Sequence, residues 1–188
     1  MISNRKKEDG GRLFAVRFLV FPKKAERRKS FLSLLKADYR FEKITDITAA
    51  DLKSAGAKLV LLDADNTLSL HGSQEPACGV PEWIEEIKKE GFSLVIISNN
   101  SKSRIKPFAE KLGLPFVFKS AKPLPKGFKK ASEKSGFGPG ETAVIGDQIF
   151  TDVLGGKIFG AKVFLTEPLG PETDFFIKIK RKFEKFIR

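Results

Sequence analysis

Carboxylate side chains follow two apolar runs of the chain, at the positions where buried strands would end. Asp63 and Asp65 come directly after the first run, and Asp147 follows the second, with Asp152 one helical turn later. Carboxylates held together out of water repel one another and lose hydration, and a bound cation relieves both costs. A hard cation with oxygen ligands and a phosphate partner suits Mg²⁺. The alternative is an Asp/Asn-rich turn that only caps the next element.

Polar groups suited to a phosphate ester stand near the ends of other predicted strands. Ser98 can donate its hydroxyl proton to a phosphoryl oxygen, and the helix start that follows at Asn99 offers backbone N–H groups. Lys122 could neutralise a phosphate as a point charge, and Gly146 permits a close backbone approach. Each signal alone is weak, since Ser and Asn also cap helices. Their order along the chain lowers the risk of a false match.

These groups must be positioned by a repeating pattern of strands and helices that begins at residue 58. Short apolar runs predict strands at 59–62, 92–97, 116–118, 142–145 and 162–165. Amphipathic segments predict helices at 80–90, 102–112, 124–135 and 149–158, and a capping box predicts a short helix at 49–55. We therefore expect an α/β fold: an open, three-layer, Rossmann-like parallel sheet of about five strands with helices on both faces. In such sheets ligands bind at the carboxyl ends of the strands.

The charge of the chain is concentrated at its ends. The 188 residues carry a net charge of +12, of which residues 1–40 contribute +8 and residues 171–188 contribute +3. We expect a basic, partly disordered N-terminal extension over residues 1–30, a catalytic domain over 31–170 and a basic amphipathic helix over 171–188. The apolar stripe of that helix would pack on the domain or lie on a membrane surface.

Basic ends suggest a partner with negative charge, such as an anionic lipid, a nucleic acid or an acidic protein. A solvated basic surface that aids solubility is the alternative. The sequence has no apolar stretch of the ~20 residues that a membrane-spanning helix needs. It has one cysteine, Cys78, so no disulfide can form within the chain. A cytoplasmic location is therefore expected.

The polar groups, taken in order, resemble the four motifs of the haloacid dehalogenase-like hydrolases. These motifs are Asp63-x-Asp65-x-Thr67, Ser98, Lys122 and Gly146-Asp147-x-x-x-x-Asp152. The segments LLDADNTL, ISNNSKSRIKPFAEKLGLPFVFKSAKP and VIGDQIFTDVLGGKIFG resemble the YqeG-like subgroup IIIA phosphatases. That subgroup includes relatives described as phosphatidylglycerophosphate phosphatases. The resemblance covers roughly residues 31–165 and implies a haloacid dehalogenase-like fold.

The resemblance implies a role for each carboxylate. Asp63 would attack phosphorus and form an aspartyl-phosphate, which splits one hard step into two. Asp65 would protonate the leaving oxygen and then deprotonate the attacking water. Mg²⁺ would be held by Asp63, the backbone carbonyl of Asp65 and Asp147, with Asp152 acting through water.

The resemblance also assigns the groups around the phosphate. Ser98, Asn99 and Lys122 would hold the phosphoryl oxygens, where charge must be balanced in the transition state. Thr67 and Gly146 would support the loops that carry the reacting groups. The second acidic residue of the first motif, Asp65, argues for phosphatase rather than dehalogenase action.

The spacing of the motifs leaves no room for a cap over the site. Only 15 residues, 68–82, separate the first motif from the next helix, and 23 residues, 99–121, separate the second and third motifs. An open site suits a phosphate on something large, or a second subunit could act as the cap. Polybasic segments gain about 1 kcal/mol per Lys or Arg near an anionic bilayer. We therefore expect a lipid phosphate such as phosphatidylglycerophosphate, with peripheral attachment at the inner face of the membrane.

Two other functions fit part of the sequence. The same enzyme could act on a soluble phosphomonoester such as a nucleotide or sugar phosphate. A non-catalytic, basic nucleic-acid-binding module would explain the charge. Two observations argue against that module: the chain has no nucleic-acid-binding motif, and its set of carboxylates at the strand ends would have no role in such a module. Nucleic acid is therefore the least favoured partner.

Overall fold

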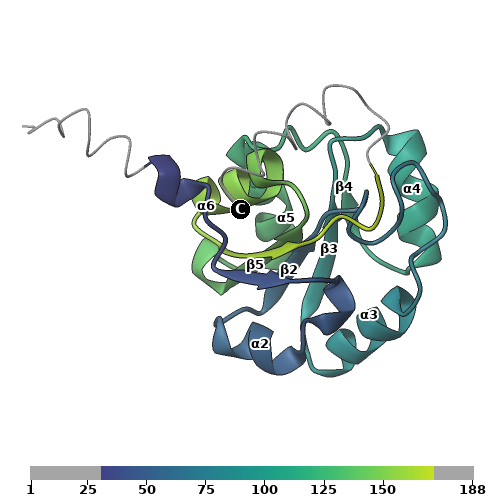
Figure 1. Cartoon of the computed structure of the whole chain (residues 1–188), viewed down its shortest axis with the longest axis horizontal. Coiled ribbons are helices and arrows are strands. Elements are labelled where there is room, and N and C mark those ends of the chain that lie inside the picture. The colour runs from purple at the N-terminus through teal and green to yellow at the C-terminus, as the bar shows by residue number, and fades with distance from the viewer. Residues whose placement is uncertain (1–30, 172–188) are drawn as a thin grey trace, which may run out of the picture.

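The computed structural model describes residues 31–171 and consists of one parallel sheet covered by helices (Figure 1). The strand order is β1-β6-β5-β2-β3-β4, and every neighbouring pair is parallel. The strands are β1 (Tyr39–Phe41), β2 (Leu59–Leu62), β3 (Ser93–Ile97), β4 (Phe116–Val117), β5 (Thr142–Gly146) and β6 (Lys162–Thr166). The predicted α/β class and open parallel sheet are confirmed.

The sheet has six strands rather than about five, because the prediction missed the edge strand β1. This strand has three residues, its apolar run is interrupted by Arg40, and it lies before the repeating pattern of strands and helices that begins at residue 58. It pairs with β6 near the other end of the described chain, and the ring of Tyr39 stacks on Phe164 with centroids 4.4 Å apart. The Asp38 carboxylate also accepts a hydrogen bond from the backbone N–H of Val163 at 2.8 Å. Contacts this distant in sequence leave no local signal.

Helices cover both faces of the sheet and divide the core in two. Residues 31–34 are helical, and the α-helices that follow are α2 (Ala49–Ser54), α3 (Val80–Lys89), α4 (Lys102–Lys111), α5 (Pro125–Ser135) and α6 (Leu154–Phe159). The short 3₁₀ turns are η1 (Ile44–Asp46) and η2 (Pro139–Glu141). Val60 and Leu62 of β2 pack with α2, α3 and α4, whereas Leu59 and Leu61 pack with α5 and α6. Alternate residues of a strand point to opposite faces. A strand with helices on both sides is therefore apolar at every position, as β2 is.

One predicted helix has a different start. The segment expected as a helix over 149–158 begins with a π-helical turn, η3 (Ile149–Val153), and continues as α6. The other predicted helices and strands agree with the structure to within one or two residues at each end. A π-turn within a helical segment often marks a functional site.

The predicted N-terminal extension, residues 1–30, and nearly all of the predicted C-terminal helix, residues 172–188, lie outside the described part of the chain. Both segments, and the domain boundaries drawn from them, stay predictions. Between residues 31 and 171, no helix combines the length and apolar character needed to cross a bilayer.

Candidate active site

The site lies at the carboxyl edge of the three central strands β5, β2 and β3. Asp63 follows β2, Ser98 follows β3 and Asp147 follows β5. Because these strands are parallel neighbours, their carboxyl ends meet at one edge of the sheet. The sheet topology thus brings together groups that are up to 84 positions apart in the sequence.

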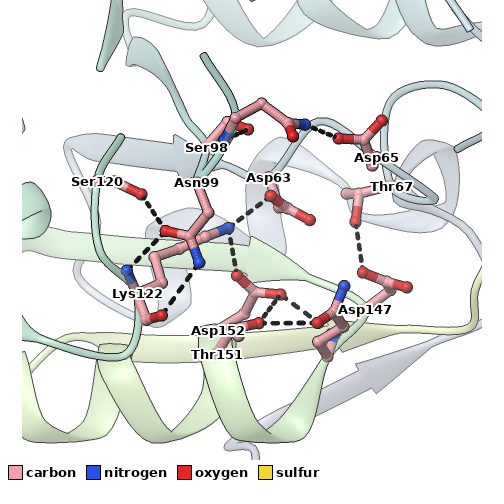
Figure 2. Close-up of polar contacts among 12 residues, drawn as sticks. Asp63, Asp65, Thr67, Ser98, Asn99, Ser120, Lys122, Asp147, Thr151 and Asp152 are labelled. Atoms are coloured by element: carbon pink, nitrogen blue, oxygen red, sulfur yellow. Dashed lines mark hydrogen bonds and ion pairs between the residues drawn. The ribbon is translucent and has the colours of Figure 1, made fainter. Parts of the chain in front are cut away.

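Asp63 and Asp152 share a single lysine (Figure 2). Lys122 Nζ donates to Asp63 Oδ1 at 2.5 Å and to Asp152 Oδ1 at 2.7 Å. All three side chains are buried. The lysine comes from the loop between β4 and α5, and its peptide bond to Pro123 is cis. The structure therefore joins three residues that the sequence analysis assigned to three separate motifs.

Burial shifts the protonation of this cluster. Loss of hydration raises the pKa of Asp63 to about 7, although the attraction of Lys122 opposes the rise and the neighbouring Asp152 and Asp65 add to it. Burial alone would lower the pKa of Lys122, but the charges and hydrogen bonds of Asp152 and Asp63 outweigh it. The pKa of Lys122 is therefore raised above its usual value. Lys122 therefore keeps its positive charge at neutral pH, whereas Asp63, with a pKa of about 7, gains or loses its proton near that pH.

Asp152 is fixed by the π-turn and by a glycine. Its Oδ2 accepts hydrogen bonds from the Gln148 N–H at 3.2 Å and from the Thr151 hydroxyl at 3.3 Å. The carboxylate lies against the Cα of Gly146, so a Cβ at that position would come within 2.6 Å of Asp152 Oδ2. The close approach expected at Gly146 is thus made by a side chain of the site itself.

Three buried carboxylates form a group that could hold a metal ion. One oxygen from each of Asp63, Asp147 and Asp152 lies within 4.8 Å of the other two. The Thr67 hydroxyl lies 3.5 Å from Asp147 Oδ1, which links the first motif to the fourth. Three carboxylates beside the single ammonium of Lys122 leave a surplus of negative charge with little water to screen it. A hard divalent cation suits this donor set in both charge and ligand type.

Ser98 and Asn99 have different surroundings. The Ser98 Oγ accepts a hydrogen bond from the Asn100 N–H at 3.2 Å, which leaves its own proton to be donated into the pocket. The amide of Asn99 instead holds the loop that carries Lys122. Its Oδ1 accepts from the Ser120 hydroxyl at 2.9 Å and from the Lys122 N–H at 2.7 Å, and its Nδ2 donates to the Lys122 carbonyl at 3.1 Å. A phosphate contact by Asn99 would therefore use its backbone.

Asp65 is held by groups that the sequence analysis did not single out. Its Oδ1 accepts from Arg104 Nη2 at 3.1 Å and from the Gly72 N–H at 3.0 Å, and its Oδ2 accepts from Asn100 Nδ2 at 2.5 Å. Asn100 lies beside a predicted site residue, so its position was a usable signal. Arg104 lies inside a helix of many charged residues, where nothing in the sequence distinguishes it.

A small pocket of about 180 Å³ opens above these groups. It is lined by Asp63, Asp65, His71, Ser98, Asn99, Asn100, Lys122, Gln148 and Thr151. A water molecule takes up about 30 Å³ in the liquid, so the pocket has room for a phosphoryl group and a few waters. The rest of a larger substrate would lie outside it.

Comparison with known proteins agrees with this geometry. A model of the haloacid dehalogenase-like hydrolases matches residues 25–160 of the chain. A Bacillus subtilis (strain 168) protein described as "Probable phosphatase YqeG" is 37% identical over 144 residues, which cover 77% of this chain and 84% of that protein.

Solved structures with a similar fold are more distant in sequence. An uncharacterized protein from Listeria monocytogenes serotype 4b has a TM-score of 0.50 and 20% identity, over 62% of this chain and 84% of that one. The cobalt-bound deoxy-D-mannose-octulosonate 8-phosphate phosphatase from Haemophilus influenzae has a TM-score of 0.50 and 15% identity, over 72% of this chain and 89% of that one. At these identities the similarity shows the fold alone.

Proposed function

The chain belongs to the haloacid dehalogenase-like hydrolases and is a phosphatase, and from this premise we propose that it is a Mg²⁺-dependent phosphomonoester hydrolase acting on a lipid phosphate such as phosphatidylglycerophosphate. The observation that carries the catalytic part is the buried cluster in which Lys122 contacts both Asp63 and Asp152 at the base of a small pocket. The lipid part is supported by the openness of the site and by the basic ends of the chain.

In the first step, a carboxylate oxygen of Asp63 attacks phosphorus. The new Asp63–phosphorus bond forms as the bond from phosphorus to the leaving oxygen breaks, and Asp65 gives that oxygen a proton. The product alcohol departs and the phosphoryl group stays on Asp63. Both side chains line the pocket, which supports these two roles.

In the second step, water attacks the same phosphorus atom. Asp65, now ionised, takes a proton from that water, and the bond between phosphorus and Asp63 breaks. Inorganic phosphate leaves and Asp63 regains its carboxylate. The same residue serves as acid and then as base, so the proton is returned at the end of the cycle.

The phosphoryl oxygens gather negative charge that the protein must balance. Lys122 supplies a positive charge at the base of the pocket, and Ser98 supplies a hydroxyl proton. Asp63, the backbone carbonyl of Asp65 and Asp147 would hold Mg²⁺, with Asp152 acting through water. When bound, Mg²⁺ draws charge from the phosphoryl oxygens.

A large substrate is favoured by what surrounds the pocket. Within residues 31–171, the segments after β2 and after β3 contain only turns and the helix α4 before the next element of the sheet domain. No domain in this part of the chain covers the pocket. A headgroup phosphate at a bilayer could therefore reach Asp63 while the rest of the lipid stays in the membrane. The basic segments at both ends of the sequence would attract an anionic surface.

Phosphate release from a panel of substrates tests this proposal. The panel holds phosphatidylglycerophosphate in mixed micelles, a nucleotide and a sugar phosphate, each with Mg²⁺ and with EDTA. We expect release from the lipid that requires Mg²⁺ and is lost in Asp63→Asn. Activity on the soluble esters but not on the lipid would show that the substrate is a soluble phosphomonoester, and the proposed catalytic mechanism would still stand. Full activity in Asp63→Asn would overturn the nucleophile assignment.

Flotation with liposomes tests the membrane part separately. The full chain should float with vesicles containing phosphatidylglycerol at moderate salt and stay at the bottom with neutral phosphatidylcholine vesicles. A chain that ends at residue 171 should float less than the full chain. Absence of binding to the anionic vesicles would contradict peripheral attachment.

A further inference from the structure

The side chain of Asp65 is held on both of its oxygens. Asn100 donates to Oδ2, while the backbone N–H of Gly72 and Arg104 both donate to Oδ1. We propose that Arg104 is a positioning residue: it anchors Oδ1 of Asp65, so that Oδ2 is the oxygen that exchanges the proton with the leaving group and with water. This inference rests on the proposed function, because it assumes that Asp65 acts as acid and base.

The contacts of Arg104 connect three parts of the fold. One nitrogen, Nη2, donates both to Asp65 Oδ1 at 3.1 Å and to the carbonyl oxygen of Ser73 at 2.6 Å. The carbonyl oxygen of Arg104 accepts from Gln74 Nε2 at 3.0 Å. The helix α4 is thereby tied to the first motif and to the loop that follows it. Since Asp65 is on a loop, such ties fix where its carboxylate lies.

The pocket distinguishes the two oxygens of Asp65. Asn100, the partner of Oδ2, is among the residues that line the pocket, and Arg104 is not. Oδ2 is therefore on the side where a substrate would bind, and Oδ1 is on the side of the helix. An anchor on Oδ1 restricts the rotation of the carboxyl group, and Oδ2, which accepts one hydrogen bond from Asn100, keeps a second lone pair for the proton.

Burial sets this ion pair apart from the other ion pairs of α4. The side chains of Arg104 and Asp65 are 19% and 11% exposed, whereas those of Lys106 and Glu110 are 53% and 62% exposed. Exposed pairs contribute little to stability. Arg104 Nη1 is also buried without a hydrogen-bond partner in the described part of the chain. Burial of Nη1 without a partner costs free energy, so the contacts of Nη2 with Asp65 and Ser73 must hold the side chain in this position.

A comparison of leaving groups separates positioning of the acid from general support of the fold. Departure of p-nitrophenolate needs no proton, whereas departure of an alkoxide does. Loss of general acid catalysis lowers the rate by about 10²–10⁴-fold. An acid that is present but misplaced should lower the rate by part of that factor. We expect Arg104→Ala to lower kcat/KM at least tenfold on glycerol phosphate or the lipid substrate, and less than threefold on p-nitrophenyl phosphate. This ratio covers only the steps up to departure of the leaving group, whereas kcat also includes the hydrolysis of the aspartyl-phosphate, which is common to both esters. Added guanidinium should restore part of the loss on the alkyl ester.

Control variants make the result decisive. Lys106→Ala removes a charge from the exposed face of the same helix and should leave both activities unchanged. Arg104→Lys keeps the charge, and serves if Arg104→Ala does not fold; its loss should again be confined to the alkyl ester. An equal loss of kcat/KM on both esters would overturn the positioning role while the proposed function stands. A wild-type protein that hydrolyses neither ester, nor the lipid, would overturn the proposed function itself.

Discussion

Asp63 is buried beside a lysine that it shares with a second carboxylate. Buried ion pairs seldom stabilise a fold, because the loss of hydration offsets most of the Coulomb attraction. Here two carboxylates compete for one ammonium, and a third, Asp147, lies within ligand distance. The arrangement therefore costs stability, and a bound cation would return part of that cost. The next two predictions follow from this conflict.

Asp63→Asn should stabilise the metal-free protein at high pH. Burial raises the pKa of Asp63 to about 7, so the folded state binds a proton more tightly than the unfolded chain, whose pKa is about 4. The contribution of this group to stability therefore falls as the pH rises from about 4 to about 7. Asparagine has no such titration. In EDTA, thermal unfolding should give a melting temperature several degrees higher for the variant at pH 8, and no difference of that sign near pH 4. Parallel profiles of the two proteins would contradict this.

Gly146→Ala should disturb the site by sterics alone. The new Cβ would lie 2.6 Å from Asp152 Oδ2, so the carboxylate must move away from Lys122. Overpacking of this kind costs about 1–3 kcal/mol, and phosphatase activity should fall at least tenfold. Gly140→Ala is the matched control, since a Cβ there meets nothing within 4 Å. Denaturant unfolding and phosphate release measure the two effects, and equal behaviour of the two variants would refute the prediction.

Two helices on the same face of the sheet, α2 and α4, are stabilised differently at their starts. Thr48 accepts a hydrogen bond from the Asp51 N–H at 3.2 Å, and the Asp51 carboxylate accepts from the Thr48 N–H at 2.9 Å. This capping box lies at the start of α2, away from the pocket. At the start of α4, which bears Arg104, Ser101 makes no side-chain cap. The helix next to the site thus depends on packing and on its contacts with neighbouring loops.

Thr48→Ala should lower the stability by about 1 kcal/mol, because a capping oxygen is lost from an exposed helix end. In a domain of this size that corresponds to a fall in melting temperature of about 2–4 °C. Ser101→Ala, at a helix start without a side-chain cap, should change the melting temperature by less than half as much. Calorimetry measures the melting temperature of both variants. An equal fall in the two melting temperatures would argue against a stabilising role for the Thr48 cap.

One edge of the sheet is held in place by contacts between segments near the two ends of the described chain. Asp38, just before β1, accepts from the Val163 N–H at 2.8 Å and pairs with Lys157 at 2.7 Å. Burial would raise the pKa of Asp38, but the hydrogen bonds and charges of Lys157, Val163 and Lys162 outweigh it and hold the pKa below its usual value. The edge strand is therefore tied to β6 partly by an ionised group.

Asp38→Asn should destabilise the protein at neutral pH but not in acid. An acid with a lowered folded pKa stabilises the fold above its unfolded pKa of about 4, and that contribution is lost as the pH falls through the folded value. Urea unfolding at pH 7 and pH 3 should show the difference between variant and wild type shrinking at the lower pH. Glu86→Gln, on the exposed face of α3, is the control. A difference that stays constant with pH would contradict the ionic tie.

The sequence alone determined the elements whose cause is local. The apolar run at 59–62, the capping box at Thr48 and the glycines that end several helices act over a few residues, and each element lies where it was predicted. The carboxylates at the strand ends were found for the same reason, since a polar residue directly after a buried strand is visible without the fold. The motif order then indicated that they belong to one site.

Only the tertiary structure decided the contacts between elements. The pairing of β1 with β6, the sharing of Lys122 by Asp63 and Asp152, and the anchoring of Asp65 by Arg104 each join residues that are tens of positions apart. A hydrogen bond or ion pair depends on distance in space, which the sheet topology sets and the sequence does not display. Arg104 could not be distinguished from the other basic residues of its helix until folding brought it to Asp65.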